Sequence, residues 1–293
     1  MLTVRETLQQ KLQSIAYLPT MPHVLLNVQK ALRDDNSAAG KIASIIREDP
    51  ALTTSVLRVA NSVMYRGKLS PKMSSIPQAV ARIGFTEVNR ICMASILVRA
   101  FDNYGKGVNH AEFWRHSLAV ATTTGIFKKY TRKPELARND VLDDAFTAGL
   151  LHDIGILAMD QFFPKLLAKV RSLAESEFIP LARAENEILG IEHGEIAGDL
   201  LASWNLPERV VDAVTWHHDP DRSADGTRRV TQMVHLADFI CVNQSIGHTL
   251  EGLYDGFSAG AWHDLGLSID QVPAMLEDLK EEEKRSQLLG GTS

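Results

Sequence analysis

Apolar residues along most of the chain recur at the three- and four-residue spacing that is typical of amphipathic helices. Leu25, Val28 and Leu32 follow Pro22 at this spacing, and Ser37 offers a capping side chain for the helix that we expect next. We find no convincing two-residue alternation of apolar and polar positions, which is the pattern of a half-buried strand. The chain is therefore predicted to be all-α.

Start and stop signals delimit further helices in the first hundred residues. Asp49 precedes Pro50, which combines a capping side chain with a proline in the first helical turn. A second helix is predicted to begin after Ser75 and to stop at Gly84, and Thr86 opens the next one. The short connections between these segments favour a bundle in which consecutive helices pack on one another.

A polar, turn-forming segment at residues 102–107 is the best internal boundary. We therefore divide the chain into an N-terminal helical half (1–102), a second helical half (103–250) and a C-terminal extension and tail (251–293). The last of these contains an amphipathic helix predicted from Pro273 onwards. All of the residues with evident chemistry lie in the second half.

The amino-acid composition disfavours nucleic acids and membranes as partners. The formal net charge is −5, with 23% charged and 45% hydrophobic residues, so a general nucleic-acid or anionic-membrane binder is disfavoured. The N-terminus lacks a signal-peptide pattern, and no apolar stretch is long enough to span a bilayer. Cys92 and Cys241 each lie in an apolar run and are predicted to be buried free thiols. We expect a cytoplasmic protein without nucleic-acid or membrane partners.

An adjacent His152–Asp153 pair interrupts the apolar run of residues 149–155. Because burying a carboxylate is costly unless it is paired or bound to a cation, Asp153 needs a partner. Five further candidates lie on predicted helices or at their ends: His116, His193, His217, His218 and Asp238. Imidazoles and carboxylates are the ligands of divalent transition metals such as iron, manganese or zinc. We therefore predict a metal centre with one or two ions.

Each candidate also has an ordinary structural interpretation. A lone histidine such as His193 is more often a hydrogen-bonded core residue than a ligand, and Asp238 alone could serve as a hydrogen-bond partner between helices. The joint occurrence of several such residues around one His-Asp pair is what favours the metal site. Glu112 lies one helical turn before His116, so its carboxylate is a candidate extra ligand.

Several further motifs lie along the chain. In the N-terminal half they are Leu18-Pro19-Thr20-Met21-Pro22, Ile46-Arg47-Glu48-Asp49-Pro50-Ala51-Leu52, Leu57-Arg58-Val59-Ala60-Asn61-Ser62 and the run 75–84. Later ones are Phe113-Trp114-Arg115-His116-Ser117, the run 148–155 and Trp204-Asn205-Leu206-Pro207. Together with the His/Asp set, these motifs resemble those of the HDOD family, the HD-related output domains of bacterial signalling proteins within the HD-domain superfamily of metal-dependent phosphohydrolases. The resemblance covers roughly residues 15–245. The resemblance implies a multi-helix bundle of the HD-domain type with an additional N-terminal helical subdomain.

The resemblance also implies how the ligands would be shared. His116, His152, Asp153 and Asp238 would hold one ion, and His193 with His217 or His218 would hold a second, with Asp153 as the bridge. Related cyclic-dinucleotide phosphodiesterases carry a lysine just after the His-Asp-Ile-Gly motif and a downstream Gly-Tyr-Pro signature. Here Ile156 takes the place of the lysine, and Asp219 and Pro220 follow the histidine pair without that signature. Loss of a cation removes one stabiliser of the transition-state charge.

These departures favour a signal-transduction output or scaffold module that retains a metal centre and has little or no hydrolase activity. The alternative is a metal-dependent phosphohydrolase acting on a nucleotide or cyclic dinucleotide, in which Asp153 would be central to catalysis. A third interpretation is that the cluster serves packing alone and binds no metal. Under the first hypothesis the N-terminal half presents a surface to a signalling or regulatory protein, such as a receiver or kinase component, and a nucleotide is a candidate ligand.

Overall fold

The computed structural model describes residues 5–8, 10, 46–62, 65, 72–101, 105, 107–247, 254 and 258–290. Every regular element within these ranges is a helix, which confirms the predicted all-α class. The chain divides into two compact units, one comprising residues 1–18 and 104–283 and the other residues 19–103 and 284–293. The helix predicted after Pro22 lies outside the described residues, and of the helix predicted after Ser37 only residues 46–48 are described, which are helical.

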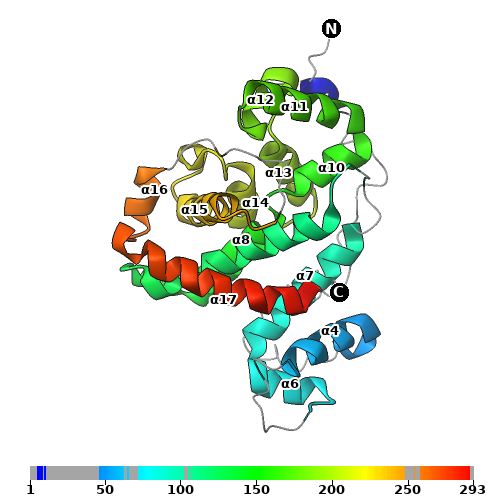
Figure 1. Ribbon diagram of the computed structural model, residues 1–293, viewed down its shortest axis with the longest axis vertical. Helices are drawn as coiled ribbons and strands as arrows, with labels where there is room; N and C mark the ends of the chain where they lie inside the picture. The colour runs from blue at the N-terminus through cyan, green and yellow to red at the C-terminus, as the bar shows by residue number, and fades with distance from the viewer. Residues whose placement is uncertain are drawn as a thin grey trace. The chain divides into compact units, whose positions relative to one another are not determined.

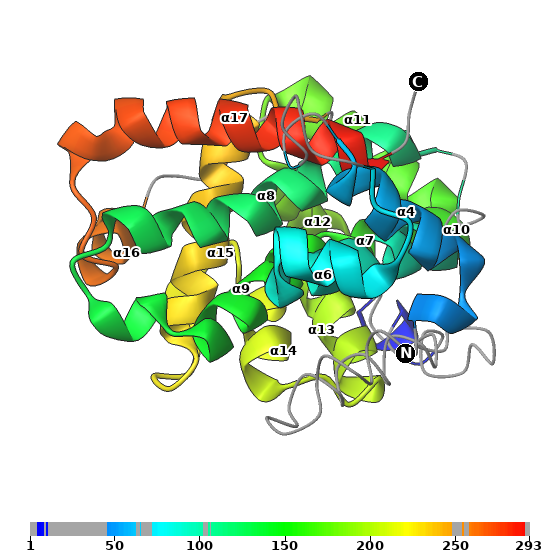
Figure 2. The same cartoon turned by 90° about the horizontal axis from the view of Figure 1, so that it is seen from below.

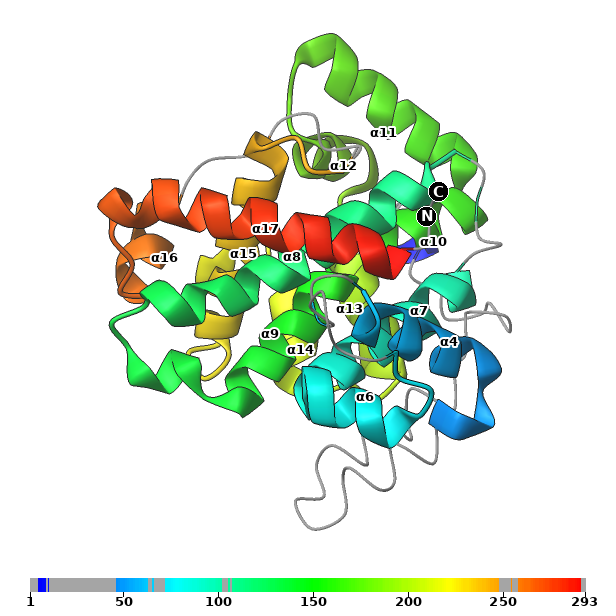
Figure 3. The same ribbon diagram turned by 60° about the horizontal axis from the view of Figure 1, so that its bottom comes forward.

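The smaller unit contains α4 (Pro50–Ala60), α6 (Ile76–Ile83) and α7 (Phe85–Phe101), which pack on one another (Figure 3). The predicted start of α4 is confirmed, because the Asp49 side chain accepts hydrogen bonds from the main-chain N–H groups of Ala51 and Leu52. Gly84 ends α6 with a positive φ of 82°. Gly84 is the single residue between α6 and α7, so the connection predicted there is short.

The larger unit contains the remaining long helices. They are α8 (His110–Tyr130), α9 (Asn139–Leu151), α10 (Ile154–Phe162), α11 (Pro164–Glu177), α12 (Leu181–Leu189), α13 (His193–Ser203), α14 (Glu208–Thr215), α15 (Arg228–Asn243), α16 (Ala259–Asp264) and the part of α17 (Val272–Gly290) up to residue 283. Short 3-10 helices at Pro134–Ala137, Pro220–Arg222 and Ile269–Gln271 join some of them. The amphipathic C-terminal helix predicted from Pro273 is thus confirmed as α17.

Helices α8, α9 and α15 pack against one another at the centre of this unit, and α13 and α14 lie beside them (Figures 1 and 2). Helix α14 contacts both α9 and α15, while α10 packs on α13. Residues far apart in the sequence therefore meet where the ends of α9, α13 and α14 face α8 and α15. Several buried histidines and the buried aspartates Asp153 and Asp238 lie at this meeting point.

Among the described residues, no helix combines the length and the apolar character that crossing a bilayer requires. Both cysteines are buried and free, as predicted.

Candidate metal centre

Asp153 lies at the centre of the site, in the turn between α9 and α10. Its side chain is 1% exposed, and neither carboxylate oxygen accepts a hydrogen bond within the described part of the chain. Imidazole nitrogens nevertheless lie close to both oxygens. A buried carboxylate in this position requires a positive charge or a proton between itself and those rings.

One oxygen of Asp153 faces the aspartate-rich cluster, which we define as His116, His152 and Asp238 together with Asp153 Oδ2. Asp153 Oδ2 lies 3.2 Å from His152 Nε2 and 4.0 Å from His116 Nε2. Asp238 Oδ1 lies 2.9 Å from His116 Nε2 and 3.6 Å from His152 Nε2. Two carboxylates and two imidazoles thus converge from α8, α15 and the end of α9.

The other oxygen of Asp153 faces the histidine-rich cluster, which we define as His193, His217 and His218 together with Asp153 Oδ1. This oxygen lies 3.2 Å from His193 Nε2 and 3.7 Å from His217 Nε2. His218 Nε2 lies 3.1 Å from His193 Nε2. His193 begins α13, whereas His217 and His218 follow the end of α14. The two oxygens of Asp153 therefore join two adjacent sets of donor atoms.

Backbone carbonyls fix the ring orientation of three ligands. The Nδ1 atoms of His116, His152 and His217 donate to the carbonyl oxygens of Ile246, Gly149 and Val214 at 3.1, 2.8 and 2.7 Å, respectively. A carbonyl oxygen can only accept, so the proton of each neutral ring is on Nδ1 and the lone pair is on Nε2. In the neutral rings, all three Nε2 atoms therefore present lone pairs toward carboxylate oxygens, an arrangement that needs a cation between them.

The residues fit divalent metal ions on two counts. First, buried donor atoms without a hydrogen-bond partner in the described residues gather at the centre: His152 Nε2, His217 Nε2, both oxygens of Asp153 and Asp238 Oδ2. Second, ligand atoms about 2.0–2.2 Å from one ion lie about 3.0–3.5 Å apart at tetrahedral or octahedral angles. Two of the six nitrogen–oxygen separations above are 3.2 Å, and the others run from 2.9 to 4.0 Å. Three overlapping groups of three residues can each offer a set of ligand atoms, and within each group these atoms lie within 4.8 Å of one another.

The electrostatics favour a positive charge between the rings and the carboxylates. Burial acts to lower the pKa of His152 and His193, but neighbouring carboxylates outweigh it and hold both pKa values well above the usual range. Burial acts to raise the pKa of Asp153 and Asp238, but the imidazoles beside them hold both values below their usual range. Burial, together with the nearby rings, lowers the pKa of His217 well below its usual value. The His217 ring is thus uncharged near neutral pH, and the lone pair on its Nε2 is available to a metal ion.

Close helix packing positions these groups. A Cβ on Gly149 would lie 2.9 Å from the Ala121 Cα, so the glycine lets α9 approach the backbone of α8. A Cβ on Gly155 would lie 2.1 Å from the carbonyl oxygen of His193, so α10 and α13 are also in direct backbone contact. The first contact sets how near His152 comes to α8. The second sets the distance from Asp153 to His193.

The structure brings together all seven predicted ligands: His116, His152, Asp153, His193, His217, His218 and Asp238. All but His218 are fully buried. The candidate extra ligand Glu112 instead forms an ion pair with Arg115 at 3.4 Å, and 34% of its side chain is exposed. No described hydrogen bond or ion pair joins Glu112 to the cluster, so its role as a ligand stays a prediction.

Two residues that support the ligands were missed by sequence reasoning. His235 is buried on α15, and its Nδ1 donates to the carbonyl oxygen of His217 at 2.7 Å. Its position three residues before Asp238 places both on one helix face, which was an available signal. Glu185 on α12 accepts hydrogen bonds from His193. No spacing in the sequence indicates this contact, because the turn between α12 and α13 creates it.

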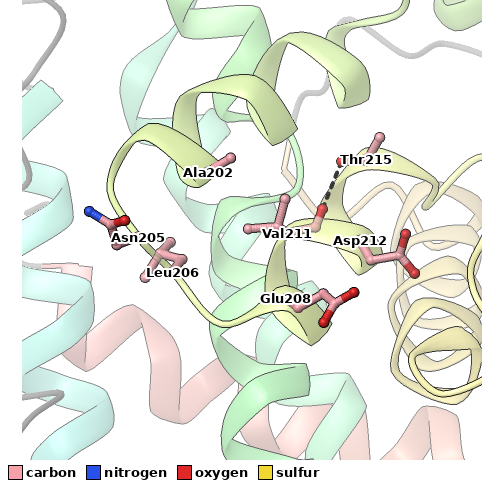
Figure 4. Close-up of a pocket in the computed structure, with 7 residues that line it drawn as sticks. All are labelled: Ala202, Asn205, Leu206, Glu208, Val211, Asp212 and Thr215. Carbon is pink, nitrogen blue, oxygen red and sulfur yellow. Dashed lines mark hydrogen bonds between the residues drawn. The ribbon is translucent and has the colours of Figure 1, made fainter.

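A separate open pocket of about 440 Å³ lies on α13 and α14, and Figure 4 shows the residues that line it. Thr215 donates to the Val211 carbonyl oxygen at 2.8 Å. Asp212 accepts hydrogen bonds from the hydroxyl groups of Ser223 and Thr227. None of the seven predicted ligands lines this pocket. The polar groups here serve local structure, and the pocket is distinct from the metal centre.

Known proteins share this fold over most of the chain. A solved HDOD domain protein of unknown function from Geobacter sulfurreducens is 26% identical, with a TM-score of 0.80 and 97% of both chains covered. A proposed phosphohydrolase from Shewanella amazonensis SB2B is 24% identical, with a TM-score of 0.73, and the match covers 97% of this chain and 96% of the other. A proposed signal transduction protein from Marinobacter aquaeolei VT8 is 24% identical, with a TM-score of 0.75, and 97% and 60% of the chains are covered.

A curated relative, an uncharacterized protein from Treponema pallidum (strain Nichols), is 26% identical over 226 residues. The match covers 75% of this chain but only 41% of that relative, so the chain spans less than half of the relative's length. The sequence model of the HDOD domain matches residues 18–220, which include the N-terminal motifs and six of the seven predicted ligands. The chain belongs to the HDOD domain family.

Proposed function

We propose that this protein is a signal-transduction output module built around a divalent metal centre, with little or no hydrolase activity. The observation that carries the proposal is the placement of Asp153, whose two oxygens face two buried sets of imidazole and carboxylate donors. The aspartate-rich cluster would hold one ion, and the histidine-rich cluster would hold a second. Imidazole and carboxylate donors without a thiolate suit iron, manganese or zinc.

The burial of the ligands supports a structural or regulatory role for the metal. Six of the seven ligands are at most 1% exposed, whereas a catalytic metal site keeps a coordination position open to substrate. Ile156, which takes the place of the phosphodiesterase lysine, is itself buried and apolar. An apolar side chain offers nothing to the negative charge that develops in phosphoryl transfer. Metal binding that fixes the helices of the bundle is therefore favoured over turnover.

A phosphohydrolase remains the second candidate function, and one specific observation favours it. Two adjacent sets of donors that share a carboxylate are the arrangement used by two-metal hydrolases, and His218 in the second set is only half-buried. When bound, such a pair of ions supplies an activated water and a clamp for a phosphate. The substrate class would be a nucleotide or cyclic dinucleotide, and Asp153 would be central.

The partner that we propose is a signalling or regulatory protein that binds the N-terminal helical half. None of the seven predicted ligands lies in that half. Its family motifs therefore do not serve the metal centre directly, which supports a role in binding a partner. One structural neighbour is named as a proposed signal transduction protein. We expect no nucleic-acid partner, because the chain carries a net charge of −5.

Metal analysis of protein purified without a metal-affinity tag tests this function. We expect up to two ions per chain in the wild type and their loss in Asp153→Ala. The matched control is Asp160→Asn, which alters a buried carboxylate on α10 that accepts hydrogen bonds from the N–H groups of Gly107 and Val108. This control should keep its metal.

The same preparations should be assayed for hydrolysis of cyclic dinucleotides and nucleotides. Metal without turnover supports the output module. Turnover that is lost in Asp153→Ala would overturn it in favour of the phosphohydrolase. A wild-type protein that binds no iron, manganese or zinc would overturn both metal-based functions and leave packing as the role of the cluster.

A further inference from the structure

Glu185 is a fully buried carboxylate on α12 that contacts one ligand of the histidine-rich cluster. Its Oε2 accepts a hydrogen bond from the main-chain N–H of His193 at 2.8 Å and another from the Nδ1 of the same ring at 2.8 Å. The other oxygen, Oε1, has no hydrogen-bond partner among the described residues. A buried charge of this kind is costly unless a positive charge nearby offsets it.

The contact distinguishes His193 from other ligands of the centre. The Nδ1 atoms of His116, His152 and His217 are held by neutral backbone carbonyls, whereas the structure places an ionisable carboxylate on the Nδ1 of His193. A carboxylate fixes the tautomer of a metal-binding histidine and makes its other nitrogen a stronger donor. Among these four rings, His193 alone has such a partner.

The two clusters differ in the number of carboxylates beside them, which indicates what the contact between Glu185 and His193 does. The aspartate-rich cluster has Asp238 as well as a share of Asp153. The histidine-rich cluster contains three imidazoles and only the other oxygen of Asp153. A divalent ion buried among neutral rings needs compensating negative charge close by. Glu185 supplies that charge through the ring of His193.

We infer that Glu185 is a positioning residue that controls the occupancy of the histidine-rich cluster and acts through His193. This inference rests on the proposed metal centre. Glu185 holds the proton of the His193 ring on Nδ1, so that the lone pair on Nε2 faces Asp153 Oδ1. The negative charge of Glu185 raises the affinity of the histidine-rich cluster for the second ion. The affinity of the aspartate-rich cluster for its ion depends on Asp238 instead.

A purely structural role for Glu185 predicts a different outcome. Helix α13 already has its own capping box, in which the side chains of Glu192 and Glu195 serve the first main-chain N–H groups. Glutamine at position 185 keeps an acceptor for the His193 N–H groups but removes the negative charge. A structural role therefore survives Glu185→Gln, whereas control of the second metal ion does not.

The test is manganese loading of the untagged full chain, with the bound metal counted by elemental analysis and the coupling of paired ions followed by electron paramagnetic resonance. We expect the wild type to bind two ions. Glu185→Gln should keep one and bind the second about 10–100-fold more weakly, with loss of the coupled signal. The matched control is Glu187→Gln on the same helix, because Glu187 is half exposed and pairs with Arg183. It should behave as the wild type.

The outcomes separate this inference from the proposed function. If Glu185→Gln binds two ions as tightly as the wild type, or loses both ions equally, the role assigned to Glu185 is wrong. A wild type that binds no manganese, iron or zinc instead refutes the metal centre itself.

A measurement on the wild type covers the case in which Glu185→Gln does not fold. Nitrogen-15 spectra of the zinc-loaded chain should show the His193 ring with its proton on Nδ1 and the metal on Nε2. Metal on Nδ1 would overturn the inference.

Discussion

Replacement of Gly155 by alanine tests whether the backbone contact between α10 and α13 holds the metal centre together. The added Cβ would lie 2.1 Å from the carbonyl oxygen of His193, 2.9 Å from its carbonyl carbon and 3.2 Å from the Ala197 nitrogen. Heavy atoms in favourable contact lie about 3.5–4.0 Å apart. The two helices would therefore have to separate by more than about 1 Å, and no side chain can rotate away to make room.

An extra methyl group in a packed core lowers the free energy of unfolding by about 1–3 kcal/mol. The atoms that the new Cβ would meet are backbone atoms, which cannot rotate away, so we expect Gly155→Ala to lie in the upper part of this range. For a unit of about 150–250 residues, each kcal/mol corresponds to a fall in Tm of about 2–4 °C. The expected decrease is therefore roughly 5–10 °C. Because His193 begins α13, the same displacement should move its Nε2 away from Asp153 Oδ1, which lies 3.2 Å away, and weaken metal binding.

Thermal unfolding followed by circular dichroism, with and without added manganese, measures both effects. Gly226→Ala is the matched control, because a Cβ at that position meets no heavy atom within 4 Å. It should unfold within about 2 °C of the wild type, since surface substitutions change stability by less than about 0.5 kcal/mol. If Gly155→Ala unfolds at the same temperature as this control and binds metal normally, the contact between α10 and α13 does not position the site.

Three further predictions follow from other parts of the chain. Asp49→Ala should destabilise the protein by about 1 kcal/mol at neutral pH through loss of the α4 cap. A hydrogen bond from Arg99 holds the pKa of Asp49 below its usual value, so the stabilising contribution of this carboxylate is present above the unfolded-state pKa and is lost as the pH falls through the folded-state pKa. Urea unfolding at pH 7 and at progressively more acidic pH should show the difference between the wild type and Asp49→Ala shrinking. Chelation should lower the Tm of the wild type but not of Asp153→Ala, because an ion at 100 times its Kd adds about 2.7 kcal/mol, and equal melting of the chelated and metal-loaded wild type would contradict this. Burial raises the pKa of Cys92 to about 12, so a maleimide at pH 8 should label this thiol only after denaturation, and rapid labelling of the native protein would show that the thiol is accessible.

Local signals in the sequence were sufficient to predict where α4 begins and where α6 ends. The side chain of Asp49 and the ring of Pro50 start α4 as predicted, and Gly84 ends α6. These signals work because capping and backbone conformation depend on neighbours within about four residues. The start of α7 lies at Phe85, one residue before the predicted Thr86, which is the ordinary uncertainty of a helix end.

The set of candidate ligands could also be named from the sequence, because its residue types are unusual in apolar helices. His152, Asp153 and Asp238 stand out against the apolar residues around them, and a buried carboxylate demands a partner wherever it lies. The supporting residues could not be predicted in this way. Glu185 resembles any other glutamate of a mixed helix until the turn at residues 190–192 brings it to His193.

The sequence by itself determined the all-α class, the boundaries of α4 and α6 and the identity of the seven candidate ligands. Only the tertiary structure decided which atoms face one another. His116 and Asp238 are 122 positions apart, yet their Nε2 and Oδ1 atoms lie 2.9 Å apart because α8 packs on α15. Likewise, the division of Asp153 between two clusters depends on the contacts of α9, α10 and α13. Local propensity acts over a few residues, whereas a site of this kind is set by helix packing and backbone contacts across the whole unit.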